Sequence, residues 1–226
     1  YSRLRYEIKR DFSNFPLKIS KGLKRPQAKF VQQMIYGILA GNKLHLSEIA
    51  RSLKETITLK KTIDRLSRNL NAFDDKDSLM HNYLALVKRH VKDDYAVIII
   101  DNSDIAKPAS KKLEALYEIR DGSTGGITQG YLTIDAAVLS EKGKMPLPVY
   151  EKVFSVAEKG FISETYENLR CLESLSQNFT PKCVRTLDRG FDANDYYRYF
   201  LKRGERFVIR AKKNRNVIYN GKTCNI

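Results

Sequence analysis

Two aspartates in this sequence each follow an apolar run that is typical of a buried β-strand. Asp101 ends the run AVIIID, and Asp188 ends the run CVRTLD. In open α/β sheets, ligands bind in the crevice at the carboxyl ends of the strands. If the two strands are neighbours, their carboxylates face each other and repel unless a cation lies between them. Either aspartate alone is more simply explained as a turn residue, but two at matching positions favour a metal site.

Carboxylate oxygens with open water positions are typical of Mg²⁺, with Mn²⁺ as a substitute. A pair of such ions assists phosphodiester cleavage by activating the attacking oxygen and stabilising the leaving oxygen. Zinc is not indicated, because Cys171, Cys183 and Cys224 are far apart and the three histidines are scattered. If the two strands are neighbours, the sequence therefore predicts a divalent-metal site held by Asp101 and Asp188.

The charge of the chain points to a nucleic-acid partner. The 41 Lys and Arg residues outnumber the 26 Asp and Glu residues, which gives a net charge of +15 and a pI near 9.7. Between Arg198 and Arg215, eight basic residues are opposed only by Glu205. A surface of this kind is expected to bind a polyanion such as DNA. No apolar run is long enough to cross a bilayer and no cysteines pair closely, so we expect a cytoplasmic protein without a membrane partner.

Residues 93–216 have the pattern of a mixed α/β domain. The run YAVIII predicts a central strand covered on both faces. A Gly-rich stretch from Gly122 to Gly130 follows, which we interpret as a mobile loop because it lacks the Lys-Ser/Thr ending of a phosphate-binding loop. Two strands joined by a hairpin near Gly143 come next. The predicted elements after the first strand are strands at 131–140 and 147–156, a helix at 163–177, a strand at 183–187, a helix at 192–202 and a strand at 206–211.

Residues 1–92 are expected to form a helical N-terminal, DNA-binding region. Phe30, Met34 and Ile38 recur at helical spacing, and Gly41 with Asn42 gives a stop signal. The segments SEIARSL and TLKKTIDRLSRNL are compatible with a helix-turn-helix and equally with a plain helical pair whose basic face is solvated. In the second segment Leu59, Ile63, Leu66 and Leu70 are expected on one apolar stripe. The candidate DNA contacts off that stripe are Lys60, Lys61, Arg65 and Arg68.

Three stretches together carry a resemblance to a known family. They are IIIDNSDIAKP, then RDGSTGGITQGY, and finally LDRGFDANDYYRYFLKRGERFVIRAKKNRN. In these stretches the chain resembles the DDE-class transposases of bacterial insertion sequences, specifically the type-four insertion-sequence family, from about Tyr95 to Asn216. The resemblance implies a ribonuclease-H-like sheet with the element order strand-strand-strand-helix-strand-helix-strand. It also implies that the first and fourth of these strands are parallel neighbours, and that Asp101 and Asp188 are the first two catalytic aspartates.

Other residues of these stretches are expected to have lesser roles. Asp192, which closes the Asp-Arg-x-x-Asp pattern, is expected to be structural as the N-cap of the next helix. Asp104 and Lys107 lie in the first motif near the predicted site, and each either takes part in the site or only shapes the turn expected after Asp101. The candidate DNA-backbone contacts are Lys107, Arg189, Arg210, Lys212 and Lys213.

The family's third catalytic residue is a glutamate on a helix that follows a β-rich insertion. Residues 217–226 resemble the start of that insertion, with an Asn-Gly type I′ turn, so we expect the chain to be a fragment that ends before the glutamate. Glu205 lies between a helix and a strand, in the wrong place to substitute for it.

The leading hypothesis is a DNA transposase that cleaves phosphodiesters at element ends and transfers strands to target DNA, as a homodimer in a DNA complex. A ribonuclease-H-like nuclease without strand transfer is one alternative. A catalytically incomplete derivative that binds DNA is the other.

Overall fold

The computed structural model describes residues 14–91, 96–139 and 145–225. The chain divides into two compact units, Tyr1–Leu86 and Val87–Ile226, whereas the sequence placed the division at residue 92. Each unit is described below by itself. In the described part of the chain, no helix has the length and apolar character needed to cross a membrane.

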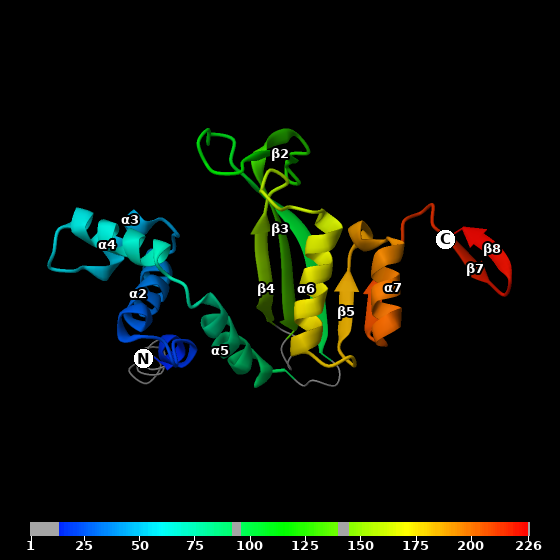
Figure 1. Cartoon of the computed structure of the whole chain (residues 1–226), viewed down its shortest axis with the longest axis horizontal. Coiled ribbons are helices and arrows are strands. Elements are labelled where there is room, and N and C mark those ends of the chain that lie inside the picture. Colours follow the sequence, from blue (N-terminus) through cyan, green and yellow to red (C-terminus); the bar gives the residue numbers. More distant parts are fainter. Residues whose placement is uncertain (1–13, 92–95, 140–144, 226) are drawn as a thin grey trace. The chain divides into compact units, whose positions relative to one another are not determined.

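The first unit is helical, as its periodicity predicts. Its core joins Phe30, Ile49 and Leu66, which come from three different helices. Gly37 lets two of these helices approach closely, since a Cβ there would lie only 2.4 Å from Cγ2 of Ile49. The helices, coloured blue to teal in Figure 1, are α2 (Arg25–Gly41), α3 (Leu46–Leu53), α4 (Leu59–Asn71) and α5 (Lys76–Lys88).

The predicted apolar stripe of α4 is only partly correct. Leu66 is fully buried, but Leu59 and Leu70 are 37% and 50% exposed. Thr62 is buried instead, because its hydroxyl donates a hydrogen bond of 3.0 Å to Glu55 in the turn before the helix. A search for apolar periodicity cannot find a buried polar residue of this kind.

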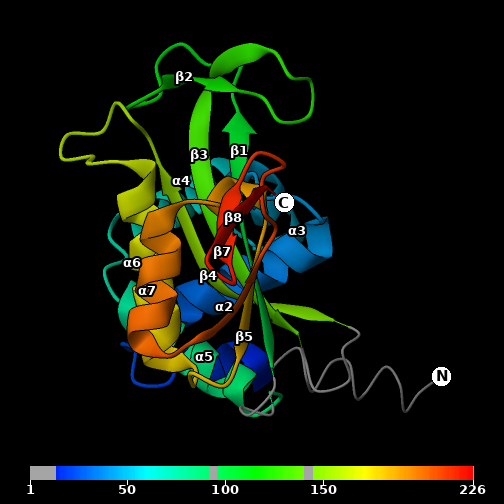
Figure 2. The ribbon, with the colours of Figure 1, turned by 90° about the vertical axis from the view of Figure 1, so that its right-hand side faces the viewer.

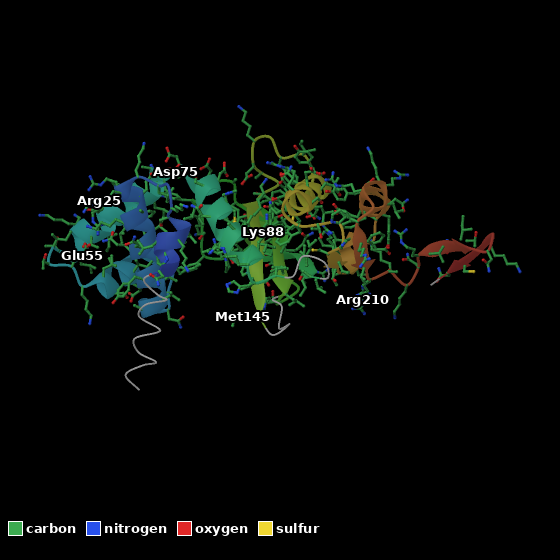
Figure 3. The ribbon with its side chains drawn as sticks, turned by 90° about the horizontal axis from the view of Figure 1, so that it is seen from below. Arg25, Glu55, Asp75, Lys88, Met145 and Arg210 are labelled. Atoms are coloured by element: carbon green, nitrogen blue, oxygen red, sulfur yellow. The ribbon has the colours of Figure 1, made fainter. Side chains whose placement is uncertain are left out.

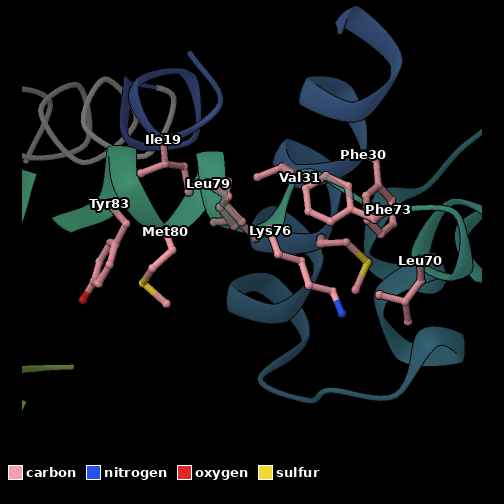
Figure 4. Close-up of a pocket in the computed structure, with 11 residues that line it drawn as sticks. Ile19, Phe30, Val31, Leu70, Phe73, Lys76, Leu79, Met80 and Tyr83 are labelled. Atoms are coloured by element: carbon pink, nitrogen blue, oxygen red, sulfur yellow. The ribbon is translucent and has the colours of Figure 1, made fainter. Parts of the chain in front are cut away.

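The first unit also contains an apolar pocket of about 510 Å³. Figure 4 shows it between side chains such as Phe30, Phe73 and Met80, with Lys76 as its one charged lining residue. The lining includes no carboxylate, histidine or cysteine. The pocket therefore offers none of the carboxylate, imidazole or thiolate ligands that commonly bind metal ions in proteins.

The second unit is a mixed α/β domain built on a six-stranded sheet. The order along the sheet is β2-β3-β1-β5-β6, and β4 pairs with β3 on the same edge as β2, opposite β1 and further along the strand. Strand β1 runs antiparallel to β3 and parallel to β5, and β5 runs parallel to β6. The elements are β1 (Val97–Ala106), β2 (Tyr117–Arg120), β3 (Ile127–Leu139), β4 (Pro146–Phe154), α6 (Glu164–Asn178), β5 (Val184–Leu187), the 3-10 turn η1 (Arg189–Phe191), α7 (Asn194–Arg203) and β6 (Arg206–Ile209).

Helices α6 and α7 lie on the same face of this sheet (Figures 1 and 2). Ile98 and Ile100 of β1 are buried, whereas Ile99, which points to the opposite face, is 42% exposed. The prediction that this strand is covered on both faces is therefore wrong for the described chain. An apolar run reports hydrophobic side chains but cannot show how many layers will cover them.

Two further corrections concern strand lengths. Strand β1 continues to Ala106 instead of turning after Asp101, because β3 is long enough to pair with it as far as Gly130. The Gly-rich stretch is also not simply a loop, since Tyr117–Arg120 pairs with Ile127–Gly130 as a hairpin. The predicted turn near Gly143 lies in residues 140–144, outside the described residues, although β3 and β4 pair as predicted.

The last described residues form the predicted hairpin of β7 (Asn216–Tyr219) and β8 (Lys222–Asn225). Asn220 and Gly221 both have positive φ angles, 50° and 73°. A type I′ turn requires this, and the Asn-Gly pair predicted it.

Candidate active site

The structure brings Asp101 and Asp188 to neighbouring positions. The parallel pairing of β1 with β5 ends at Ile100 and Leu187, so Asp101 of β1 and Asp188, which directly follows β5 with extended backbone, are the next residues along the two chains. Side chains alternate along a strand, and Ile100 and Leu187 are buried on the helical side. Both carboxylates therefore lie on the opposite, open face of the sheet, where they are exposed.

Each of these carboxylates accepts a hydrogen bond from a nearby backbone N–H. The amide of Asn102 donates to Oδ1 of Asp101 at 3.0 Å, and the amide of Gly190 donates to Oδ1 of Asp188 at 2.7 Å. A Cβ on Gly190 would lie 2.9 Å from that same oxygen of Asp188, so a larger residue there would displace the carboxylate. These two hydrogen bonds orient both side chains through Oδ1 and leave Oδ2 of each aspartate for another ligand.

Two carboxylates that the sequence did not single out lie in the same row across the sheet. Asp135 of β3 pairs with Asp101, and Glu151 of β4 pairs with Asp135. All of these side chains point to the open face, because directly paired residues share a face. Each of the predicted strands YLTIDAAVLS and LPVYEKVFSV contains one carboxylate, which was the available signal. Placing these carboxylates beside Asp101 required the strand register.

The charges of this row affect Asp101. Burial raises the pKa of Asp101, and the carboxylates of Asp188 and Asp135 raise it further, against the opposing effect of the Asn102 hydrogen bond. Negative charge at Asp101 is therefore less stable than in a solvated aspartate. A bound cation would offset this cost.

The fit of a metal ion to these residues is partial. Within the described ranges 14–91, 96–139 and 145–225, no three His, Cys, Asp or Glu side chains come together as a metal-binding group. Asp101 and Asp188 supply oxygen donors of the kind that Mg²⁺ and Mn²⁺ prefer. They fit two ligands of an ion whose remaining positions would be filled by water, substrate or a further residue.

Basic residues lie beside one end of this row. The amide of Arg210 donates to the carbonyl of Leu187 at 3.2 Å, so Arg210, labelled in Figure 3, follows β6 at the level of Asp188. Arg189 is exposed immediately after Asp188. Lys212 and Lys213 are exposed two and three residues beyond Arg210.

Lys107 is not part of this group. It follows the end of β1, six residues from Asp101, which corresponds to about 20 Å along a strand. Asp104 has a structural role, since its Oδ1 accepts a hydrogen bond of 2.9 Å from Gly122 and holds the hairpin loop of β2 and β3. The expectation that Lys107 lies near the site assumed a turn after Asp101, and that turn is absent.

Asp192 is structural, but not for the predicted reason. Helix α7 has Ala193 at its N-cap, without a side-chain cap. Asp192 is instead 3% exposed and binds Lys212, Tyr197 and Arg215. The sequence could not reveal this, because Arg215 lies 23 residues further along the chain.

Glu205 is excluded as a third carboxylate of the site. Its side chain is 4% exposed and lies 3.5 Å from the guanidinium of Arg185, which is itself 1% exposed. The side chain of Arg185 points to the same face of β5 as that of the buried Leu187, two residues away. This ion pair is therefore on the helical side of the sheet.

In the first unit, the candidate DNA contacts of α4 fall into exposed residues and one residue that binds within the protein. Lys60, Lys61 and Arg68 are exposed. Arg65 instead donates two hydrogen bonds of 2.8 Å to Glu55 and one of 2.7 Å to Gln33 of α2. The guanidinium of Arg65 joins the turn before α4 to α2, so we remove this residue from the candidate DNA surface.

Comparison with known proteins gives little further information. No family model matches the chain, and no curated protein matches it. One solved structure that resembles it is the Mos1 strand transfer complex, with 13% sequence identity and a TM-score of 0.29. The likeness covers 82% of this chain and 58% of that chain, so this chain spans less than two thirds of its length. A TM-score of 0.29 does not establish a shared fold.

Proposed function

We propose that the chain is part of a DNA transposase of the DDE class with a ribonuclease-H-like core. The observation that carries the proposal is the position of Asp101 and Asp188, side by side where the parallel pairing of β1 and β5 ends. The order of strands and helices in the second unit supports it, since β1 and β5 are parallel neighbours joined through an antiparallel pair of strands and α6.

Asp101 and Asp188 would hold Mg²⁺, or Mn²⁺ in its place, through the oxygens that their backbone hydrogen bonds leave available. When bound, the ion supplies charge neutralisation and activation of the attacking oxygen in phosphodiester chemistry. The amides of Asn102 and Gly190 keep the two carboxylates oriented before the ion binds. This preorganisation reduces the reorganisation needed when the charge of the reacting phosphate increases.

The basic residues would bind the DNA backbone. Arg189, Arg210, Lys212 and Lys213 lie at the Asp188 end of the acidic row, so a phosphate could contact them while its neighbour approaches the metal. Phosphate contacts of this kind position DNA without reading its sequence. In the proposed transposase, Lys60, Lys61 and Arg68 of the first unit would contribute to binding element ends, and a homodimer would hold two ends and the target.

A second candidate function is DNA binding without cleavage. It is favoured by the absence of a three-residue metal-binding group among the described residues. Two carboxylates bind a hard divalent ion less firmly than three, so such a chain would bind DNA while turning over slowly or not at all.

The deciding experiment measures Mg²⁺-dependent nicking and strand joining on duplex DNA by the 226-residue chain. Variants Asp101→Ala and Asp188→Ala remove a metal ligand each, and Asp195→Ala is the matched control because Asp195 is an exposed carboxylate on α7. Cleavage lost in the first two variants and retained in the control supports the transposase proposal, with joining separating it from a plain nuclease. DNA binding without cleavage supports the second function, and cleavage that survives both site substitutions would refute the site.

A further inference from the structure

The segment after β6 contains a basic turn that is fastened at both ends. The amide of Arg215 donates to the carbonyl of Lys212 at 3.0 Å, which closes a turn with Lys213 and Asn214 at its tip. Lys212, Lys213 and Asn214 are exposed. A surface turn of this length, with few buried apolar contacts, is ordinarily among the most mobile parts of a fold.

The carboxylate of Asp192 fastens both ends of this turn. Its Oδ2 accepts a hydrogen bond of 2.6 Å from the amide of Lys212, at the start of the turn. Its Oδ1 forms an ion pair with Nε of Arg215, at the end of the turn. The side chain of Asp192 is fully buried and that of Arg215 is 23% exposed, so solvent screens this contact less than an ordinary surface pair.

Arg215 uses the rest of its guanidinium to strengthen the same attachment. Its NH2 group donates to the backbone carbonyl of Asp192 at 3.0 Å, and its NH1 group donates to Oδ1 of Asn194 at 3.2 Å. The guanidinium also lies over the ring of Tyr197, 5.0 Å from its centre, and the Tyr197 hydroxyl donates to Asp192 at 2.8 Å. A planar fork with several donors can make all of these contacts at once, and a lysine ammonium cannot.

Asp192 is also connected to the candidate metal ligand. Only the 3-10 turn Arg189–Phe191 separates it from Asp188, and Gly190 of that turn donates to the Asp188 carboxylate. Phe191 is 1% exposed and packs on Tyr196 at 5.2 Å between ring centres, which fixes the turn on the core. The basic turn is therefore held relative to Asp188 through a short and well-packed connection.

We propose that Asp192 is a positioning residue, which holds the Lys212–Arg215 turn so that its basic side chains bind a DNA phosphate beside Asp188. The inference depends on the proposed function, because it assumes that the open face near Asp188 receives DNA. The buried carboxylate of Asp192 favours binding of a polyanion because it orders the cations that contact the polyanion.

The test is a comparison of two substitutions that change the net charge equally. Asp192→Asn and Asp195→Asn each raise the charge of +15 by one, and Asp195 is 61% exposed with only a 3.9 Å ion pair to Arg198. If charge alone matters, both variants of the full chain bind duplex DNA slightly more tightly. If Asp192 positions the turn, Asp192→Asn binds several-fold more weakly, and its slope of log K against log salt falls by about 1, the value for one lost phosphate contact.

Two further measurements separate positioning from a general loss of structure. Lys213→Ala should lower the salt slope by itself, and adding Asp192→Asn to it should change the slope no further, since both act through the same contact. Arg215→Lys keeps the positive charge but loses the planar guanidinium, so it should weaken DNA binding as Asp192→Asn does. Arg198→Lys, the matched control, should leave DNA binding unchanged. This conservative pair keeps the proposal testable if Asp192→Asn fails to fold.

Two outcomes would overturn the inference, and a third would count against the proposed function. Equal DNA affinities for Asp192→Asn and Asp195→Asn, or additive effects of Asp192→Asn and Lys213→Ala, would show that Asp192 does not act through the turn. Wild-type chain that binds DNA without any salt dependence would instead contradict the proposed function itself.

Discussion

Replacing Asp101 by asparagine is expected to stabilise the metal-free protein while removing its response to Mg²⁺. Asparagine has almost the same shape and keeps an oxygen that can accept the hydrogen bond from Asn102. It removes the negative charge that lies next to Asp188 and pairs with Asp135. The perturbation therefore isolates the charge of Asp101 from its packing.

The size of the effect follows from the strand geometry. Directly paired side chains on neighbouring strands are about 5 Å apart. Two unit charges at that distance repel by about 0.8 kcal/mol at the dielectric constant of water, which is the appropriate limit for an exposed carboxylate. With two such neighbours and further screening by salt, we expect a gain of about 1 kcal/mol. For a unit of this size that gain raises the melting temperature by about 2–4 °C.

Thermal unfolding of the full chain in EDTA and in Mg²⁺ measures both parts of the prediction. A Mg²⁺ concentration of about ten times Kd should stabilise the wild type by about 1.4 kcal/mol and leave Asp101→Asn unchanged, so the order of stability reverses. Glu118→Gln, an exposed substitution on β2 with the same charge change, is the control and should respond to Mg²⁺ like the wild type. A lower melting temperature for Asp101→Asn in EDTA, or equal Mg²⁺ shifts in all three proteins, would refute the reasoning.

Three other substitutions test the fold and the site. Gly37→Ala should destabilise the first unit by about 1–3 kcal/mol in thermal unfolding, because its methyl group would overlap Cγ2 of Ile49; Ile49→Leu, which removes that branch, should restore much of the loss, and no rescue would argue against the contact. Gly190→Ala should weaken Mn²⁺ binding at least several-fold by calorimetry, because its methyl group displaces the Asp188 carboxylate, and an unchanged affinity would contradict that role. Burial would raise the pKa of Asp192, but the hydrogen bonds from the Lys212 amide and the Tyr197 hydroxyl and the charge of Arg215 hold it below its ordinary value of 3.8. The stability that this lowering provides is present above that value and lost as the pH falls through the folded pKa, so urea unfolding between pH 7 and pH 3 should show a smaller loss for Asp192→Asn than for the wild type.

Much of the second unit could be predicted from local patterns. Apolar runs located β1, β5 and β6, and the capping serine Ser163 begins the helix that follows β4, as its hydrogen bond with the amide of Tyr166 shows. The parallel pairing of β1 with β5 agrees with the arrangement implied by the family resemblance. The predicted length of β1 was wrong, since the residues from Asp101 to Asp104 are polar and turn-like and form a strand only because β3 pairs with them.

The site could be predicted in part for a similar reason. Asp101 and Asp188 stand at strand positions that sequence alone can recognise, whereas Asp135 joins them only through the register of β1 with β3. Arg65 was assigned to DNA because it is basic and lies off an apolar stripe, and its partners Glu55 and Gln33 could not be foreseen. Contacts between distant segments decide such cases, and no local pattern encodes them.

The nine residue pairs between β1 and β3 have a consequence for how accurately the sheet assembles. A slip of β1 by one residue would turn Ile98 and Ile100 toward water and turn the carboxylate of Asp101 toward the helical side. Such a slip exposes apolar area and buries charge at the same time, so the mispaired sheet would be strongly disfavoured. The alternation that separates Asp101 from the core thus protects against misassembly, and a chain that folds at all would fold with its acidic row on the open face.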